Sequence, residues 1–304
     1  MTPQTSYHDP VLLKESIDGL DVNPAGVYVD VTFGGGGHSR EILSRLGPQG
    51  KLYAFDQDPD ALANEIDDPR FTLISENFRY IKRFLRMHQV KHVDGILADL
   101  GVSSHQFDEA DRGFSTRFDA RLDMRMNQKS DLDAVKVLNY YDESELNRIF
   151  VEYGELRIAP KLTRKIMAAR DEKPITTVAD LKAICAPLVP ERIEHKLLAQ
   201  IFQAVRIEVN QEMDVLHDFL LQAKELLQPG GRLSVISYHS LEDRPVKRFM
   251  RNGLFIGEPE KDMFGRASVP FKKVGGLIVP TAAEIKKNNR ARSAKLRIAE
   301  RIED

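Results

Sequence analysis

The chain has 304 residues, of which 42% are hydrophobic and 30% charged, and its formal net charge is −2. This composition is typical of a globular protein with one large or two smaller domains, and it excludes a polycation that binds nucleic acid over its whole surface. No apolar stretch approaches membrane-spanning length, and the N-terminus lacks a basic-then-apolar signal. The single cysteine, Cys185, excludes an internal disulfide, and no Cys/His cluster has zinc spacing. We therefore expect a cytoplasmic protein with neither a membrane partner nor a bound metal.

The chain is organised around residues 27–46, where an apolar, β-branched run ends in four consecutive glycines, Gly34 to Gly37. Helical spacing of apolar residues follows, and Gly47-Pro48 ends it. A strand, a glycine turn and a helix in this order form the first half of a nucleotide-type βαβ unit. Glycines let a ligand approach bare backbone, and the start of the helix offers unpaired N–H groups. The segment therefore predicts a ligand site.

The glycine motif leaves the ligand open. A dinucleotide site favours G-x-G-x-x-G/A, but the third position here is Ser39 or Arg40. Asp30, four residues before the first glycine, suits a cationic ligand better than a pyrophosphate. S-adenosylmethionine (AdoMet), with its sulfonium and ammonium groups, is such a ligand. A glycine turn that binds nothing is the third interpretation of the motif taken alone.

Three further strands are predicted at 51–55, 71–74 and 94–99, each followed by a residue that could meet a ligand. Asp56 ends the second strand, where a carboxylate can accept both ribose hydroxyls of NAD or AdoMet. Phe78 follows the third strand, where it would lie against an adenine ring or belong to the core. Asp99 ends the fourth strand, at the topological switch point where ligands of such sheets bind.

From residue 107 to about residue 209 the sequence predicts helices and no convincing strand. Helices are expected at 142–153 behind a Ser/Asp-rich cap, at 158–170, at 178–185 behind Thr177, and at 192–207. A simple crossover connection is much shorter than a hundred residues. We therefore expect an all-helical domain at 107–209, inserted for substrate recognition between two parts of an α/β domain, 1–106 and 210–304.

The second part of the α/β domain is expected to resume with a helix at 212–227, which Gln228-Pro-Gly-Gly ends. A fifth strand at 232–237 and a basic helix ending near Met250 follow. Residues 254–256 are a candidate strand, and 257–279 are expected to form a loop because they are rich in Gly, Pro and Lys. The alternating segment 294–299 predicts a last, antiparallel strand.

Two basic stretches in this second part predict a polyanionic partner. Four residues spaced as one helical face are Arg244, Lys247, Arg248 and Arg251. Four more, in a stretch without acids, are Lys286, Lys287, Arg290 and Arg292. Charge runs are often only solvated faces, but two of them beside a nucleotide-type site favour RNA binding.

Motifs placed in order along nearly the whole chain resemble the RsmH (MraW) family. They include His8-x-Pro-Val-Leu-Leu, Asp30-x-Thr-Phe-Gly, Asp99-Leu-Gly-Val-Ser-Ser104, Arg112-Gly-Phe-Ser115, Leu122-Asp-Met-Arg, Ser240-Leu-Glu-Asp243 and Asn289-Arg-Ala-Arg-Ser293. The resemblance implies a class I (Rossmann-like) AdoMet-dependent methyltransferase sheet with an inserted helical domain. It also implies methylation of the N4 amine of a decoding-region cytidine in 16S ribosomal RNA, within the small ribosomal subunit. A homodimer is one option for the assembly.

The resemblance also implies which residues contact AdoMet: Gly36, Gly37, His38, Asp56, Phe78, Asp99 and Gln106. We predict that Asp99 is catalytic and accepts a hydrogen bond from the target amine, with the carbonyl of Leu100 assisting. An aromatic group must stack on the base, and the choice among four side chains stays open: Phe107, Phe114, Tyr238 and His239. An NAD-dependent oxidoreductase and a non-catalytic RNA-binding factor are the alternative functions.

Overall fold

The computed structural model describes residues 10–188, 190–265 and 267–303. The chain divides into two compact units: Met1–Gly101 together with Met213–Asp304, and Val102–Glu212. These boundaries lie a few residues from the expected ones at 106 and 209. The motif residue His8 lies outside the described residues.

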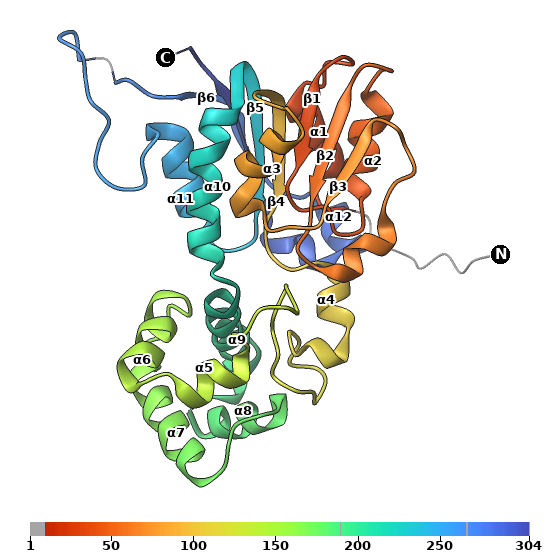
Figure 1. The fold of residues 1–304 in the computed structure, drawn as a ribbon. Coiled ribbons are helices and arrows are strands. Elements are labelled where there is room, and N and C mark those ends of the chain that lie inside the picture. The colour runs from red at the N-terminus through yellow and green to blue at the C-terminus, as the bar shows by residue number, and fades with distance from the viewer. Residues whose placement is uncertain (1–9, 189, 266, 304) are drawn as a thin grey trace. The chain divides into compact units, whose positions relative to one another are not determined.

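The first unit contains a mixed seven-stranded sheet, counted over the described residues, with the order β3-β2-β1-β4-β5-β7-β6 (Figure 1). The strands are β1 (Val27–Asp30), β2 (Lys51–Phe55), β3 (Phe71–Ile74), β4 (Val93–Asp99), β5 (Leu227–Ser237), β6 (Phe271–Ile278) and β7 (Lys295–Arg301). Neighbours among β1 to β5 pair in parallel, whereas β7 is antiparallel to both β5 and β6. The antiparallel last strand is therefore confirmed.

Helices cover both faces of this sheet. On one face, α1 (Leu13–Leu20) and α2 (Gly37–Arg45) pack on a cluster that includes Tyr28. On the other, α3 (Ile81–Met87), α10 (Glu212–Leu226) and α11 (Ser240–Asn252) pack on a cluster that includes Val29. Successive strand residues point to opposite faces, which explains why both neighbours in β1 are buried. The expected class I methyltransferase fold is confirmed by this doubly covered sheet and its strand order.

Short elements complete the first unit. They are η1 (Pro59–Asn64), η2 (Phe78–Tyr80), α12 (Ala282–Lys287) and η6 (Asn289–Ser293). Among the helices that the structure describes, none is long and apolar enough to cross a bilayer.

The second unit is built from helices. Its elements are α4 (Ser104–Asp108), η3 (Ala110–Arg112), α5 (Ala134–Tyr140), α6 (Glu143–Glu152), α7 (Ala159–Glu172), α8 (Val178–Cys185), η4 (Ala186–Leu188), η5 (Glu191–Ile193) and α9 (Glu194–Asn210). The Asp142 and Thr177 side chains cap α6 and α8, as their sequences predict. Over the described residues of this unit, the only β pairing is an isolated bridge between Arg121 and Thr177.

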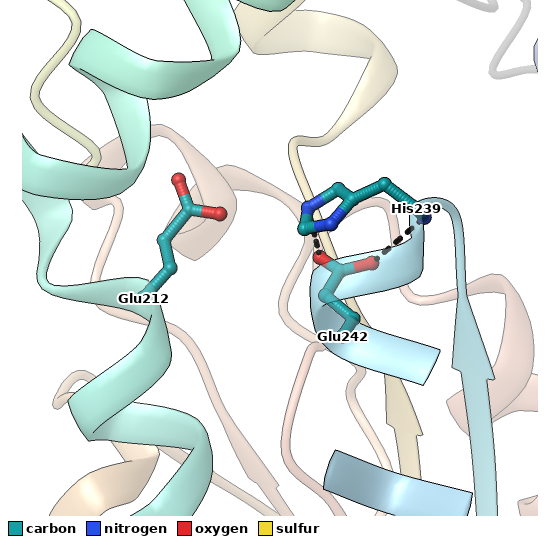
Figure 2. A group of neighbouring side chains, drawn as sticks. All are labelled: Glu212, His239 and Glu242. Atoms are coloured by element: carbon teal, nitrogen blue, oxygen red, sulfur yellow. Dashed lines mark hydrogen bonds and ion pairs between the residues drawn. The ribbon is translucent and has the colours of Figure 1, made fainter. Parts of the chain in front are cut away.

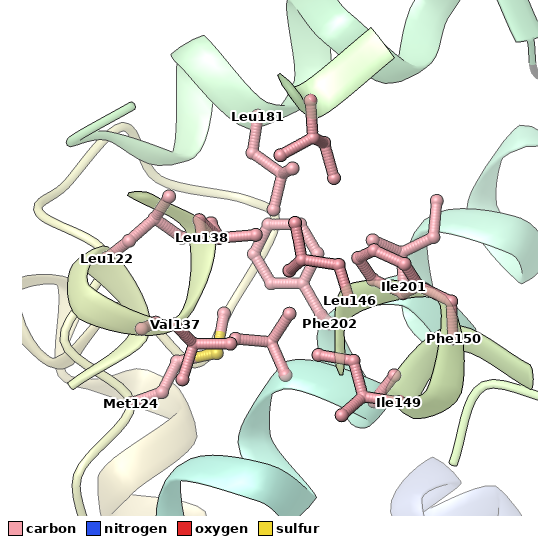
Figure 3. Close-up of a cluster of buried hydrophobic side chains, with 14 of the residues drawn as sticks. Leu122, Met124, Val137, Leu138, Leu146, Ile149, Phe150, Leu181, Ile201 and Phe202 are labelled. Atoms are coloured by element: carbon pink, nitrogen blue, oxygen red, sulfur yellow. The ribbon is translucent and has the colours of Figure 1, made fainter. Parts of the chain in front are cut away.

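The helices of the second unit enclose their own hydrophobic core (Figure 3). Phe150 and Ile149 from α6 lie against Ile201 and Phe202 from α9, and all four are buried. Apolar residues recur along α9 at the spacing of one helical face, so this helix supplies a continuous stripe to the core. Because each unit has its own core, the insertion leaves the sheet intact.

Two expectations about local structure were wrong, and one helix was missed. Residues 254–256 form no strand; Phe255 instead stacks on Phe249 of α11, with ring centroids 4.9 Å apart. The expected loop at 257–279 contains β6, an edge strand that is mostly exposed and therefore lacks a clear apolar alternation. Helix α5 was not predicted at all.

We predict that Phe150→Ala lowers the free energy of unfolding of the helical unit by about 3–5 kcal/mol, because it leaves a cavity at a fully buried position. Urea denaturation followed by far-ultraviolet circular dichroism measures the change. The control is Val151→Ala on the same helix, where the side chain is 48% exposed and the expected cost is below about 0.5 kcal/mol. Equal effects of the two substitutions would contradict the packing described here.

Candidate active site

The glycine loop joins β1 to α2 in a conformation that side chains do not tolerate. Gly34 and Gly36 have φ angles of 50° and 73°, which lie in the left-handed region. A Cβ atom on Gly36 would lie 2.8 Å from the ring of Phe33, and one on Gly37 would collide with Pro10. Glycine at these two positions therefore lets the loop pack closely against Phe33 and Pro10.

Hydrogen bonds fix the loop's carbonyl groups. The Gly34 carbonyl accepts from Asn64 Nδ2 at 3.0 Å, and the Gly35 carbonyl accepts from Arg40 Nη1 at 2.6 Å. The first N–H groups of a helix have no partner within the helix, so those of Gly37 and His38 can donate to a group outside α2. The loop thus presents donors and keeps its acceptors occupied.

Asp30 is fully buried beneath this loop. Its carboxylate accepts hydrogen bonds from the Ser39 hydroxyl at 2.7 Å and the Thr32 backbone N–H at 3.1 Å. Burial raises the pKa of Asp30, and the bonds from Ser39 and Thr32 oppose that rise. The side chain has no exposed surface, so Asp30 supports the loop from inside, whereas its place in the sequence suggested direct contact with a cationic ligand.

Asp56 ends β2 beside the loop, as expected. One carboxylate oxygen accepts from the Gly34 N–H at 2.8 Å, and the other from the Asp58 N–H at 2.9 Å. Burial raises the pKa of Asp56 to about 6, although both backbone bonds favour the charged form. Each carboxylate oxygen has a second lone pair, so the group can still accept ribose hydroxyls while it holds the loop.

Phe78 begins η2, after β3, with its side chain half-buried. Its ring meets Phe219 of α10 edge-on, with centroids 5.4 Å apart. The next residue is anchored to the same helix, because Arg79 Nη2 donates to Asp218 at 2.7 Å and Gln222 Nε2 donates to the Arg79 carbonyl at 2.6 Å. The turn holds Phe78 in place and leaves part of its ring uncovered. A ring that packs against a bound ligand needs such an uncovered face.

Asp99 ends β4 at the carboxyl edge of the sheet, where its side chain is 22% exposed. Its backbone N–H donates to the Thr32 hydroxyl at 2.7 Å, and its Oδ1 accepts from the Tyr238 hydroxyl at 2.8 Å. Burial raises the pKa of Asp99 to about 6, whereas His38 and the Tyr238 bond lower it. Because β4 pairs with β1, Asp99 lies beside the glycine loop. This is the switch point of the sheet, where the sequence predicts the carboxylate.

His38, in the first turn of α2, is 5% exposed, and burial lowers its pKa. Its Nε2 lies 3.1 Å from the carbonyl oxygen of Val11. Because a carbonyl only accepts, Nε2 of the neutral ring carries the hydrogen, and Nδ1 is left with a lone pair. That Nδ1 lies 4.0 Å from Oδ2 of Asp99, so the side chain of His38 faces Asp99 from the glycine loop.

The end of β5 and the first turn of α11 bring further polar groups to the same edge. Glu242, 2% exposed, accepts from the Tyr238 N–H at 2.8 Å and pairs with His239 Nε2 at 3.1 Å (Figure 2). Glu212, also drawn there, belongs to the second unit and pairs with Arg206 at 2.8 Å.

Two of the four candidate stacking groups can be judged from their packing. Phe114 is 5% exposed within the core of the helical unit, so it is not available to a base. Tyr238 uses its hydroxyl to bond Asp99, which ties its ring to the site. The choice among Phe107, Tyr238 and His239 stays open.

Gln106, also assigned to the ligand, lies in the second unit and is 5% exposed. Its Oε1 accepts from the Ser103 N–H at 3.1 Å, and its own N–H donates to the Ser103 hydroxyl at 3.2 Å. This reciprocal pair is the capping box of α4, and the Ser-x-x-Gln spacing is a signal from which this short helix could have been predicted. The structure therefore gives Gln106 a helix-capping role, and its contact with a ligand stays a prediction.

The two basic stretches lie on the surface of the first unit. Arg244, Lys247 and Arg251 are exposed along α11, whereas Arg248 donates to the Gly257 carbonyl at 2.5 Å. The exposed members of the other stretch are Lys286 and Lys287 at the end of α12 and Arg292 in η6, with Arg290 half-buried between them.

We predict that Asp99→Asn stabilises the protein above neutral pH. The folded pKa near 6 exceeds the ordinary value of 3.8, so the folded state holds this proton more tightly than the unfolded chain does. The protonated Asp99 carboxyl therefore stabilises the fold at low pH, and this stabilisation is lost as the pH rises from about 4 to about 6. An asparagine keeps an acceptor for Tyr238 and removes the charge, for a gain of roughly 1–3 kcal/mol at about pH 7.5.

Urea denaturation of both proteins between about pH 4.5 and 7.5 measures this gain, which should grow with pH. A gain that does not change with pH would show that the charge of Asp99 is not its source.

Comparison with known proteins gives the family. The model of the MraW methylase family matches residues 5–302. A Flavobacterium johnsoniae protein named ribosomal RNA small subunit methyltransferase H is 67% identical over 302 residues, which are 99% of this chain and 100% of that relative. A Bacteroides thetaiotaomicron protein of the same name is 55% identical over 299 residues, 98% of each chain. Among solved structures, a Streptococcus thermophilus rRNA methylase is similar over 95% of each chain, with a TM-score of 0.42 and 13% identity. Because the family model spans nearly the whole chain, this protein belongs to the MraW methylase family, which confirms the resemblance and the methyltransferase class that its motifs predict.

Proposed function

We propose that this methyltransferase uses AdoMet to methylate the N4 amine of a cytidine in the decoding region of 16S ribosomal RNA. The relatives are named as methyltransferases of small-subunit ribosomal RNA, which supports the substrate class. The observation that carries the proposal is the position of Asp99. A carboxylate with a raised pKa is held at the carboxyl end of β4, beside a glycine loop that presents helix N–H groups.

The residues present fit AdoMet. Glycine at positions 36 and 37 keeps the loop tight against Phe33 and Pro10, and the N–H groups at the start of α2 can donate to the ligand. The Asp56 carboxylate suits the ribose hydroxyls, and the half-buried ring of Phe78 suits the adenine. His38 and Asp99 would lie at the methionine end of the ligand, where a carboxylate complements the ammonium and sulfonium charges. When bound, AdoMet supplies a methyl group on a positively charged sulfur, which leaves with the electrons of the broken carbon–sulfur bond.

A cytosine amine is a poor nucleophile, because its lone pair is delocalised into the ring. The site must therefore hold the amine in one orientation and accept hydrogen bonds from its N–H groups, which favours a pyramidal nitrogen with a localised lone pair. Such positioning supplies a large share of the rate of an enzymatic reaction. Asp99 is the acceptor that we assign to this role, and the carbonyl of Leu100 assists it.

The methylated nitrogen carries a positive charge and must release one proton. The Asp99 carboxylate can take that proton, because burial has raised its pKa toward the neutral range. Its Oδ1 is already bonded to Tyr238, so Oδ2 is the oxygen that would face the amine. The reaction then ends with a neutral N4-methylcytidine. The proton passes to Asp99 and afterwards to water.

RNA would bind through phosphate contacts around this edge of the sheet. The backbone N–H of Leu12 donates to Glu284 of α12 at 2.7 Å, and Leu12 follows the Val11 carbonyl that holds His38. The exposed lysines Lys286 and Lys287 at the end of α12 are therefore suited to phosphates near the target nucleotide. We assign the helical unit to recognition of RNA shape, because the target base must be unstacked and presented to a recessed site.

Asp99→Ala should leave the fold and measurable AdoMet binding intact, while the rate of methyl transfer falls roughly 100- to 10,000-fold because the amine loses its acceptor. Labelled AdoMet, ribosomal RNA and nucleoside analysis measure transfer, and calorimetry measures binding. The control is Asp67→Ala, which removes an exposed carboxylate from the loop before β3. Normal turnover of Asp99→Ala would remove this residue from the mechanism.

Reversing the charge of Lys286 and Lys287 to glutamate should weaken RNA binding and flatten its dependence on salt, by about 0.7 in logarithmic slope for each phosphate that the variant no longer neutralises. Filter binding at several salt concentrations measures the slope. The matched control reverses Lys51 and Lys91, which are exposed at the amino ends of β2 and β4. If both pairs change the slope equally, the effect is one of net charge and the α12 lysines have no special place in binding.

A further inference from the structure

The Tyr238 side chain bonds Asp99 directly. Its hydroxyl lies 2.8 Å from Asp99 Oδ1, and its ring packs against a buried apolar cluster that includes Ile236. A Cβ atom built on Gly101 would be 3.6 Å from Tyr238 Cδ2, an ordinary contact distance. Tyr238 therefore bonds the catalytic carboxylate, and its ring leaves room for only a small residue at Gly101.

The backbone of Tyr238 is fixed as firmly as its hydroxyl. Its N–H donates to the buried carboxylate of Glu242 in the first turn of α11, at 2.8 Å. Ring contacts with the cluster of Leu12, Ile236 and Leu296 hold the middle of the side chain. A hydroxyl supported in this way can restrain the torsion of the Asp99 side chain, because a carboxylate that rotated would give up a charge-assisted hydrogen bond.

We propose that Tyr238 is a positioning residue for methyl transfer: its hydroxyl holds Asp99 Oδ1 and thereby leaves Oδ2 to accept from the substrate amine. This inference rests on the function proposed above. Burial keeps the pKa of Tyr238 well above 10, so the group remains a hydrogen-bond donor throughout the working range of the enzyme. One oxygen of Asp99 is thus assigned to the protein and the other to the substrate.

The same bond favours the charged form of Asp99. The other groups that face this carboxylate are His38 from α2, Asp30 from β1 and Glu242 from α11. A protonated His38 would lower the pKa of Asp99, whereas the two acids raise it when charged. Without the tyrosine hydroxyl, burial and the two acids would keep Asp99 protonated up to a higher pH, and a protonated carboxyl accepts poorly.

Tyr238→Phe removes only the hydroxyl and tests the proposal. Single-turnover methylation of ribosomal RNA should slow about tenfold at neutral pH, and the acid limb of its pH profile should move about one unit toward alkaline pH. The KM for RNA and the Kd for AdoMet should stay within about twofold. Carboxyl NMR of protein with labelled aspartate, with the Asp99 signal identified by its disappearance in Asp99→Asn, should show the same shift without any substrate.

The control is Tyr53→Phe, which removes the hydroxyl of a buried tyrosine on β2. It should leave both the pH profile and the Asp99 signal unchanged. An unmoved acid limb in Tyr238→Phe, with or without a slower rate, would overturn the positioning role. If the wild-type enzyme forms no methylated cytidine at all, the proposed function fails, whereas the NMR shift still reports on Tyr238 and Asp99.

Discussion

The candidate active site depends on one buried carboxylate, that of Asp30. Asp30 accepts from Ser39 in α2 and from the Thr32 backbone, and the Thr32 hydroxyl bonds to Asp30 as well as to the N–H of Asp99. Three segments that are distant in sequence are thereby linked: the end of β1, the start of α2 and the end of β4. A buried carboxylate is costly unless its oxygens are satisfied, so this arrangement is stable only when all three segments are in place.

Two further carboxylates, those of Asp56 and Asp99, lie at the same edge of the sheet in different surroundings. Asp56 accepts from two backbone N–H groups, whereas Asp99 accepts from one hydroxyl and has the His38 imidazole 4.0 Å away. Burial raises the pKa of each to about 6. The fold thus keeps acidic groups near the point where their protonation changes, a property more useful for binding and proton transfer than for stability.

Much of the architecture could be predicted because it is encoded locally. The apolar runs of β1, β2 and β4, the capping residues Asp142 and Thr177, and the alternation in β7 each act within a few neighbouring residues. Elements with weak local signals were not predicted correctly. The edge strand β6 is exposed, and the ring of Phe255 packs on a helix although its sequence neighbours suggest a strand.

The fold class, the family and the candidacy of Asp56, Phe78 and Asp99 follow from the order of the amino acids, because strand ends and glycine spacing are properties of contiguous residues. The atoms that these groups meet follow from packing in three dimensions, which buries Asp30 and joins Tyr238 to Asp99 across 139 positions of chain. Hydrogen bonds between distant strands leave no periodic trace in sequence, since they depend on how the sheet is ordered and how its helices pack.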